Sequence, residues 1–400
     1  MDGKALPAAA SFLCQKPSGQ DPFLFSDPGE SGIMGMYKFT ERQAKEMYLH
    51  NRIIKAGICL LAAASLLTGC GKKSEMVPAE TSPAPKPVVI GFSQLGAESD
   101  WRSANTQSMK TTFTAENGYQ LIFEDGQQKQ SNQIRAIRTF IQQDVDYIVL
   151  APVTETGWDT VLQEAKDAGI PVILLDRQVD VEDDSLFTCW VGSDFELEGR
   201  KVTEWLRQYT IRKGIDPSEI HIANIQGTIG ASAQIGRTKG LARAAEENGW
   251  ELLAEVTGDF TQTKGREVMA ELLDTYEDLN VVYCENDNEA FGAIEAIEAA
   301  GRKAGSDLQA GEIMVISFDG VKKDAMEYVY EDKISCIGEC NPQQGAMVQE
   351  VIGKLERGET PEKFSYVQEG MLTHDDTVPE VMVGGKKYPV TVVTGEMIQE

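Results

Sequence analysis

The sequence predicts an α/β protein with two doubly wound parallel-sheet lobes, a hinge between them and a central ligand cleft. Apolar runs alternate with amphipathic segments, which is typical of parallel strands covered by helices on both faces. The chain has 400 residues, more than one hydrophobic core usually serves. About ten strands are also more than one twisted sheet comfortably holds. Two lobes are therefore the economical architecture.

The predicted strands are short, continuous apolar runs, as expected where both faces of a sheet are covered. They are Val88–Phe92, Tyr119–Phe123, Tyr147–Leu150, Val172–Leu175, Ile220–Ile225, 251–256, Val281–Tyr283 and Ile313–Ser317.

The predicted helices lie between these strands and carry apolar residues on one face, as Ile134, Ile137 and Ile141 show. Their ranges are 100–117, 129–143, 156–168, 195–210, 232–248, 263–275 and 288–300. Glycines fall where helix ends favour a positive φ, at Gly118, Gly169, Gly249 and Gly301.

An export signal is predicted at residues 47–69, where a basic segment precedes a short apolar run. The run is too short to span a bilayer. It ends in Leu67-Thr68-Gly69-Cys70, which resembles the lipobox of bacterial lipoproteins, so Cys70 is the predicted lipidation site. A coincidental cysteine is the alternative. Residues 1–46 are interpreted as an over-extended reading frame ahead of a start at Met47.

Residues 70–87 contain several prolines and little to bury, which predicts a solvated tether.

The net charge of −26 disfavours nucleic-acid binding. The mature chain has no paired Cys-x-x-Cys spacing, so we expect neither a metal site nor a cofactor. A Cys336–Cys340 disulfide is a minor alternative to two free thiols.

Polar side chains follow most of the predicted strands, where open α/β sheets bind ligands. Carboxylates and guanidinium groups can bind neighbouring hydroxyls of a sugar, and aromatic rings can cover its C–H face. Each Asp or Asn, taken singly, could instead cap the following helix. The candidates are Ser93, Asp125, Asp176, Arg177, Asn286 and Asp319, with Trp101, Arg102, Arg237 and Phe260 just beyond strand ends.

Several longer motifs then identify a family resemblance. They include IGFSQLGAESDWR (90–102), EDGQQKQSNQIRAIRTF (124–140), the LLDR motif, IQGTIGASAQIGRTKG (225–240), GDFTQTKGREVM (258–269) and ISFDG (316–320). Residues 88–364 resemble the ribose-binding-protein class of bacterial periplasmic sugar receptors, and are most similar to its galactofuranose-binding members. The resemblance implies the type I periplasmic binding protein fold.

By motif, the resemblance implies ligand-binding roles for Ser93, Glu98, Trp101, Arg102, Asp176, Arg177, Arg237, Phe260, Asn286, Asp319 and Glu339. Two departures argue against ribose as the ligand. Trp101 and Arg102 replace paired phenylalanines of the ribose binder, and Ala151 replaces its asparagine.

We expect an N-terminal lobe over 88–191 and 340–370 and a C-terminal lobe over 192–339. Hinge strands are expected near Thr188–Ser193 and Glu339–Pro342. The lobe to which 371–400 belongs is left open.

The resemblance implies a monomeric, lipid-anchored receptor on the extracytoplasmic side of the cell envelope that delivers a monosaccharide to an ABC permease. A receptor feeding a sensor kinase or chemoreceptor is the alternative, and the identity of the sugar stays open. A LacI-type repressor would need a basic helix-turn-helix where the proline-rich tether stands. An enzyme is not expected, because no nucleophile elbow or phosphate loop accompanies the carboxylates.

Overall fold

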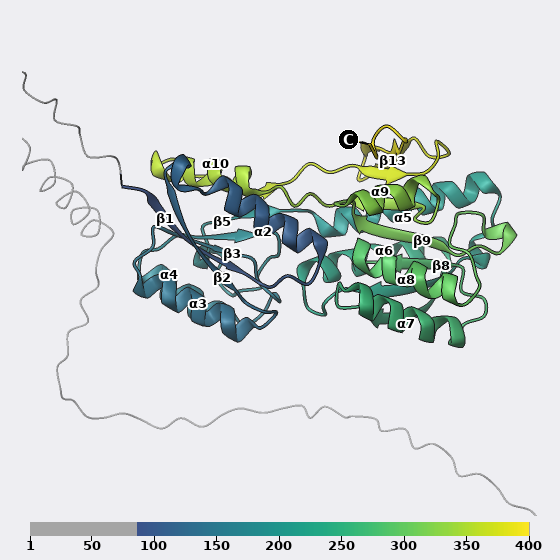
Figure 1. The fold of residues 1–400 in the computed structure, drawn as a ribbon, viewed down its shortest axis with the longest axis horizontal. Helices are drawn as coiled ribbons and strands as arrows, with labels where there is room; N and C mark the ends of the chain where they lie inside the picture. The colour runs from purple at the N-terminus through teal and green to yellow at the C-terminus, as the bar shows by residue number, and fades with distance from the viewer. Residues whose placement is uncertain (1–85, 400) are drawn as a thin grey trace, which may run out of the picture. The chain divides into compact units, whose positions relative to one another are not determined.

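A computed structural model describes residues 86–399 of the chain. Figure 1 shows two sheets, each flanked by helices. The predicted signal, the anchor at Cys70 and nearly all of the tether lie outside the described residues. Among the described helices, none combines the length and the apolar character that crossing a membrane requires.

The first sheet has six strands in the order β11-β5-β4-β3-β1-β2, all of them parallel. Its strands are β1 (Val88–Gln94), β2 (Tyr119–Asp125), β3 (Tyr147–Leu150), β4 (Val172–Leu175), β5 (Cys189–Gly192) and β11 (Phe364–Tyr366). Its helices are α2 (Asp100–Thr112), α3 (Gln130–Gln142), α4 (Asp159–Asp167) and α10 (Gly345–Glu356).

The helices of this first lobe cover both faces of its sheet (Figure 1). Side chains of α3 and α4, such as Phe140 and Leu162, pack on one face. Side chains of α2 and α10, such as Met109 and Val348, pack on the other. The strands are therefore buried on both sides, which explains why they read as unbroken apolar runs.

The second sheet has seven strands in the order β15-β12-β10-β9-β8-β6-β7. Its strands are β6 (His221–Gln226), β7 (Glu251–Thr257), β8 (Val281–Cys284), β9 (Met314–Asp319), β10 (Cys336–Glu339), β12 (Met371–Thr373) and β15 (Thr391–Val392). Its helices are α5 (Phe195–Lys213), α6 (Ser232–Asn248), α7 (Gln262–Thr275), α8 (Asp287–Ala299) and α9 (Lys323–Tyr330). A hairpin of β13 (Glu380–Val383) and β14 (Lys386–Pro389) packs beside α5 and α6 in the same apolar cluster.

Every predicted strand and helix is present, with ends shifted by a few residues. The glycines predicted at helix ends all have positive φ, for example 74° at Gly249. The hinge strand expected near Thr188–Ser193 is β5, and the one expected near Glu339–Pro342 overlaps only the last residue of β10. The sequence reading missed α9, α10 and the short strands after residue 360. The predicted α/β architecture of two doubly wound sheets is confirmed.

The chain crosses between the two sheets at three places. The crossing segments are residues 193–194 after β5, 340–344 between β10 and α10, and 367–370 between β11 and β12. The sequence reading expected only two crossings, the first of them within what is strand β5. The missed third crossing returns the chain to the second sheet, so the segment left open, 371–400, contributes β12 and β15 there.

Candidate functional site

A pocket of about 290 Å³, a volume that includes open solvent, lies between the carboxyl ends of the two sheets. This is where doubly wound sheets bind ligands. It is lined by Glu98, Ser99, Trp101, Arg102, Asp176, Arg177, Phe195, Ala233, Arg237, Phe260, Asn286, Asp319 and Cys340. Most of the predicted ligand-binding residues are in this set.

The first lobe supplies a compact network of four buried charges. Arg102 donates to Asp176 over 2.6 Å and to Glu98 over 3.1 Å. Arg177 lies 3.5 Å from Glu98 and donates to the carbonyl oxygen of Val153 over 2.7 Å. Burial, reinforced by the charge of Arg102, lowers the pKa of Arg177 to about 10. Burial would also lower the pKa of Arg102, but Asp176 and Glu98 outweigh it and raise that pKa.

This network leaves three buried polar atoms without a partner in the protein. They are Oε2 of Glu98, Nη1 of Arg102 and Nε of Arg177. The side chains that carry them all line the pocket and are 3% exposed or less. A buried group without a hydrogen bond costs about 1–3 kcal/mol, and more if it is charged. Hydroxyl groups of a bound ligand would supply the missing partners.

The second lobe contributes Arg237 from α6. Its Nε donates to Glu198 over 2.9 Å, and its Nη2 lies 3.5 Å from Asp319. Burial raises the pKa of Asp319 well above its usual range, although Arg237 opposes the shift. The carboxyl of Asp319 is therefore disposed to hold a proton and to donate it in a hydrogen bond.

Aromatic rings complete the wall. The ring of Phe260 lies 5.4 Å from the guanidinium of Arg177, and Trp101 lies 4.7 Å from that of Arg102. Phe195 faces Arg237 at 5.5 Å. Planar cations stacked on rings form a rigid surface that has both apolar and hydrogen-bonding parts.

Three pocket residues have backbone conformations that side chains other than glycine rarely adopt. The φ angles are 63° at Asp176, 59° at Phe260 and 102° at Asp319. Such conformations cost of order 1–3 kcal/mol each and cluster at functional sites. Here they lie at or just beyond strand ends, where they turn the side chains toward the pocket.

Polar contacts between the lobes close the mouth of the pocket. On one side, Asp100 pairs with Lys322 over 2.7 Å, and its amide donates to Asn288. On the other side, the amide of Gln178 donates to Ser232 over 2.7 Å. The structure is thus the closed form of the two lobes.

Three predicted ligand-binding residues do not line the pocket. Ser93 is buried within β1, beside the Gln133 amide. Asp125 is exposed at the end of the edge strand β2, where it accepts from the Gln127 amide. Glu339 accepts from the amide of Gly370 and so ties two neighbouring segments together. The three side chains make these structural contacts instead, so their assignment as ligand-binding residues is corrected.

Asn286 lines the pocket, yet its side chain is already engaged. Its Oδ1 accepts from the Glu289 amide at the start of α8, and its Nδ2 donates to the carbonyl oxygen of Phe260. The helix-cap alternative therefore describes much of what this residue does.

The sequence reading missed four lining residues. Ser99 caps α2 by accepting from the amide of Arg102 and directly follows the predicted residue Glu98, so its place in the motif could have revealed it. Phe195 and Cys340 lie at crossings between the sheets, which only the topology shows to border the pocket. Ala233 carries no chemical signal.

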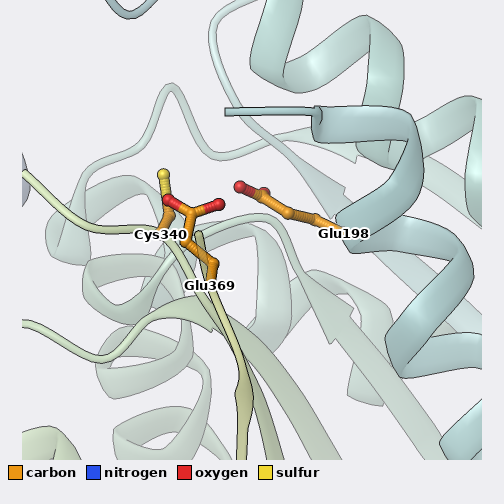
Figure 2. A group of neighbouring side chains, drawn as sticks. All are labelled: Glu198, Cys340 and Glu369. Carbon is orange, nitrogen blue, oxygen red and sulfur yellow. The ribbon is translucent and has the colours of Figure 1, made fainter. Parts of the chain in front are cut away.

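Glu198, Cys340 and Glu369 are the described residues whose side chains could together hold a metal ion, and Figure 2 shows them facing one another. Their candidate ligand atoms lie within 4.8 Å of one another. Arg237 and the buried Lys201 already bring positive charge to this cluster, so we assign no cation to it.

The four described cysteines are free and buried, which rules out a Cys336–Cys340 disulfide here.

The chain matches the family model described as a periplasmic binding protein domain over residues 90–360. It is 38% identical to the galactofuranose-binding protein YtfQ of Escherichia coli, over 74% of this chain and 91% of the relative. It resembles a solved Mycobacterium smegmatis structure in complex with β-D-fucofuranose, with 38% identity, a TM-score of 0.67 and coverage of 72% and 92%. It also resembles the arabinose transporter component of Shewanella sp. ANA-3 bound to L-arabinofuranose, with 38% identity, a TM-score of 0.66 and coverage of 72% and 93%.

Proposed function

Because the chain belongs to the periplasmic binding protein family, we propose that it binds one monosaccharide in its furanose ring form. The pocket is small and is lined by residues from both sheets, which favours one small ring over a long chain of sugars. The names or titles of three relatives at 38% identity mention furanose sugars, and this supports a ligand in the furanose form. The group of candidates is galactofuranose and related hexoses and pentoses.

The observation that carries the proposal is the set of three unpartnered buried atoms on Glu98, Arg102 and Arg177. Together they offer one acceptor and two donors within a single pocket. Adjacent sugar hydroxyls both donate and accept, so they match such a mixed set better than a purely anionic or purely apolar ligand does. The stacked aromatic side chains would cover the apolar face of the ring.

A thermal-shift screen tests this proposal. The panel holds D-galactose, L-arabinose, D-fucose and D-ribose, together with methyl glycosides locked in the furanose or pyranose form. A ligand at 100 times its Kd adds about 2.7 kcal/mol of stability, which is readily seen as a rise in Tm. A shift by pyranosides alone would refute the furanose assignment, and no shift by any sugar would refute sugar binding.

The receptor is proposed to deliver its sugar to an ABC permease on the extracytoplasmic face of the membrane, as a monomer. Delivery to a sensor kinase or chemoreceptor uses the same pocket and differs only in the partner. We propose no catalysis: incubation with glycosides should give no product, and detection of a free aglycone would contradict this.

The lipid anchor at Cys70 is proposed from the Leu67-Thr68-Gly69-Cys70 motif. Protein expressed from Met47 in a bacterium should partition into detergent, and Cys70→Ser should abolish this. Cys59→Ser, within the same apolar run, is the matched control and should leave partitioning unchanged. Mass spectrometry that finds an unmodified Cys70 in the membrane fraction would contradict the anchor.

A further inference from the structure

One carboxyl group connects the three segments that cross between the lobes. Oε1 of Glu369, on the third segment, accepts from the hydroxyl of Ser193 and from the amide of Asn341, each over 2.7 Å. Ser193 belongs to the first crossing and Asn341 to the second. Every path of the chain between the two sheets therefore meets at this carboxyl group.

A second carboxyl faces it. Glu198 of α5 is 1% exposed, and its Oε1 has no hydrogen-bond partner. Figure 2 shows this carboxyl turned toward Glu369, and the two groups lie within 4.8 Å of each other. Two carboxyl groups this close and this buried do not both ionise readily, so the pair retains a proton.

The surrounding charges decide which member keeps that proton. Arg237 from α6 donates to Oε2 of Glu198 over 2.9 Å, which favours the ionised form of Glu198. Lys201 from α5 donates to the backbone carbonyl oxygen of Glu369 and not to its carboxyl group. The thiol of Cys340 completes the cluster, and Asp319 from β9 lies 3.5 Å from Arg237. Glu369 is thus the member that holds the proton.

The pKa shifts of the two carboxyl groups agree with this geometry. Burial, reinforced by the charge of Glu198, raises the pKa of Glu369 to about 8. Burial likewise raises the pKa of Glu198, against the effects of Arg237 and Lys201. Cys340 also lines the sugar pocket, so the cluster borders the cleft that opening of the lobes would fill with water.

We propose that Glu369 is a positioning residue for sugar binding, whose protonated carboxyl group holds the three crossing segments in the closed arrangement. The inference rests on the proposed sugar-binding function. In the open form, water reaching the cluster would let Glu369 ionise at lower pH. Closure then takes up a proton, so sugar affinity falls as the pH rises toward about 8 and becomes constant above it. The limiting slope for one proton is about tenfold per pH unit.

The test compares Glu369→Gln with the wild type by calorimetry between pH 5.5 and 9, with D-galactose and L-arabinose as probes. Glutamine can keep both bonds to Ser193 and Asn341 and offers an N–H to Glu198, so it imitates the protonated acid. We expect affinity within about threefold of the wild type at low pH and no decline toward pH 8. Glu362→Gln, an equal charge change at an exposed position just before β11, should keep the wild-type profile. A wild-type pH profile in Glu369→Gln would overturn the proposal.

A second experiment needs no sugar, so its outcome tests this proposal independently of the proposed function. For an acid whose pKa is raised by folding, stability falls as the pH rises from the unfolded value of about 4.3 to the folded value. Because Glu369 ionises at lower pH in the open form, the Tm of the ligand-free wild type, relative to that of Glu369→Gln, should fall from about pH 4.5 and become constant below about pH 8. Glu369→Ala should lower the Tm below both at pH 6, because Ser193 and Asn341 lose their acceptor. Parallel Tm profiles of the wild type and Glu369→Gln would refute the shared proton, whether or not any sugar binds.

Discussion

Arg177 illustrates how a single side chain combines structural and ligand-binding roles. Its Nη1 is held by the carbonyl oxygen of Val153 and its Nη2 lies near Glu98, while Nε has no partner. Two of its nitrogens therefore fix the plane of the guanidinium, and the third is left for a ligand. A lysine point charge cannot hold this geometry.

Arg177→Ala should weaken binding of the sugar found in the screen by roughly 10- to 200-fold. The estimate takes a charged hydrogen bond as worth about 1.5–3 kcal/mol, at 1.4 kcal/mol per tenfold. Arg177→Lys should recover little of that loss. Calorimetry measures both variants.

The matched control is Arg243→Ala, at an exposed arginine on α6 that pairs with Glu247. It should change affinity by less than about twofold. Near wild-type affinity in Arg177→Ala would make Arg177 a structural ion-pair residue and would require a different ligand-binding set.

At the scale of elements, the loops after β6 and β7 fit together through one glycine. A Cβ placed on Gly227 would overlap the ring of Phe260. The amide of Gly227 also donates to the buried carboxylate of Glu285 over 2.9 Å, which fixes the loop. The absence of a side chain at position 227 thus gives Phe260 its place in the pocket wall.

Gly227→Ala should displace the Phe260 ring and weaken sugar binding by about 5- to 150-fold, because overpacking of a closed site costs about 1–3 kcal/mol. Calorimetry measures the affinity, and circular dichroism checks that the fold is retained. Gly353→Ala, within α10 and away from the pocket, is the control and should bind normally. Unchanged affinity in Gly227→Ala would show that the ring position does not matter for the ligand.

At the scale of the whole molecule, closure depends on contacts that are individually weak. Lys322, which pairs with Asp100 across the mouth, is 49% exposed, and such a pair contributes at most about 1 kcal/mol. The charged groups within the pocket come from both lobes, and Glu98, Arg102 and Arg177 of the first lobe each have a buried atom without a partner in the protein. A ligand that contacts both lobes would therefore shift the balance toward the closed form.

Small-angle scattering should accordingly show a smaller radius of gyration once the cognate sugar is added. Arg177→Ala at the same sugar concentration is the control and should remain at the larger radius. An unchanged profile for the wild type at saturating sugar would indicate a pocket that does not open and close.

The sequence by itself determined the strand and helix order, because apolar runs and amphipathic segments report burial directly. It also singled out Glu98, Arg102, Arg177 and Arg237, which line the pocket, because these residues belong to long family motifs. It failed for Asp125, because a strand end reads alike at the sheet edge and at the cleft. Only the order of strands in the sheets separates the two cases.

The tertiary structure alone decided which groups meet. Ser193, Asn341 and Glu369 are far apart in the chain, and no periodicity predicts that one carboxyl joins them. Likewise, the unpartnered atoms on Glu98, Arg102 and Arg177 follow from how four charges pack together. Local patterns record whether a residue is buried, whereas hydrogen-bond partners and shared protons depend on distances that only the folded chain sets.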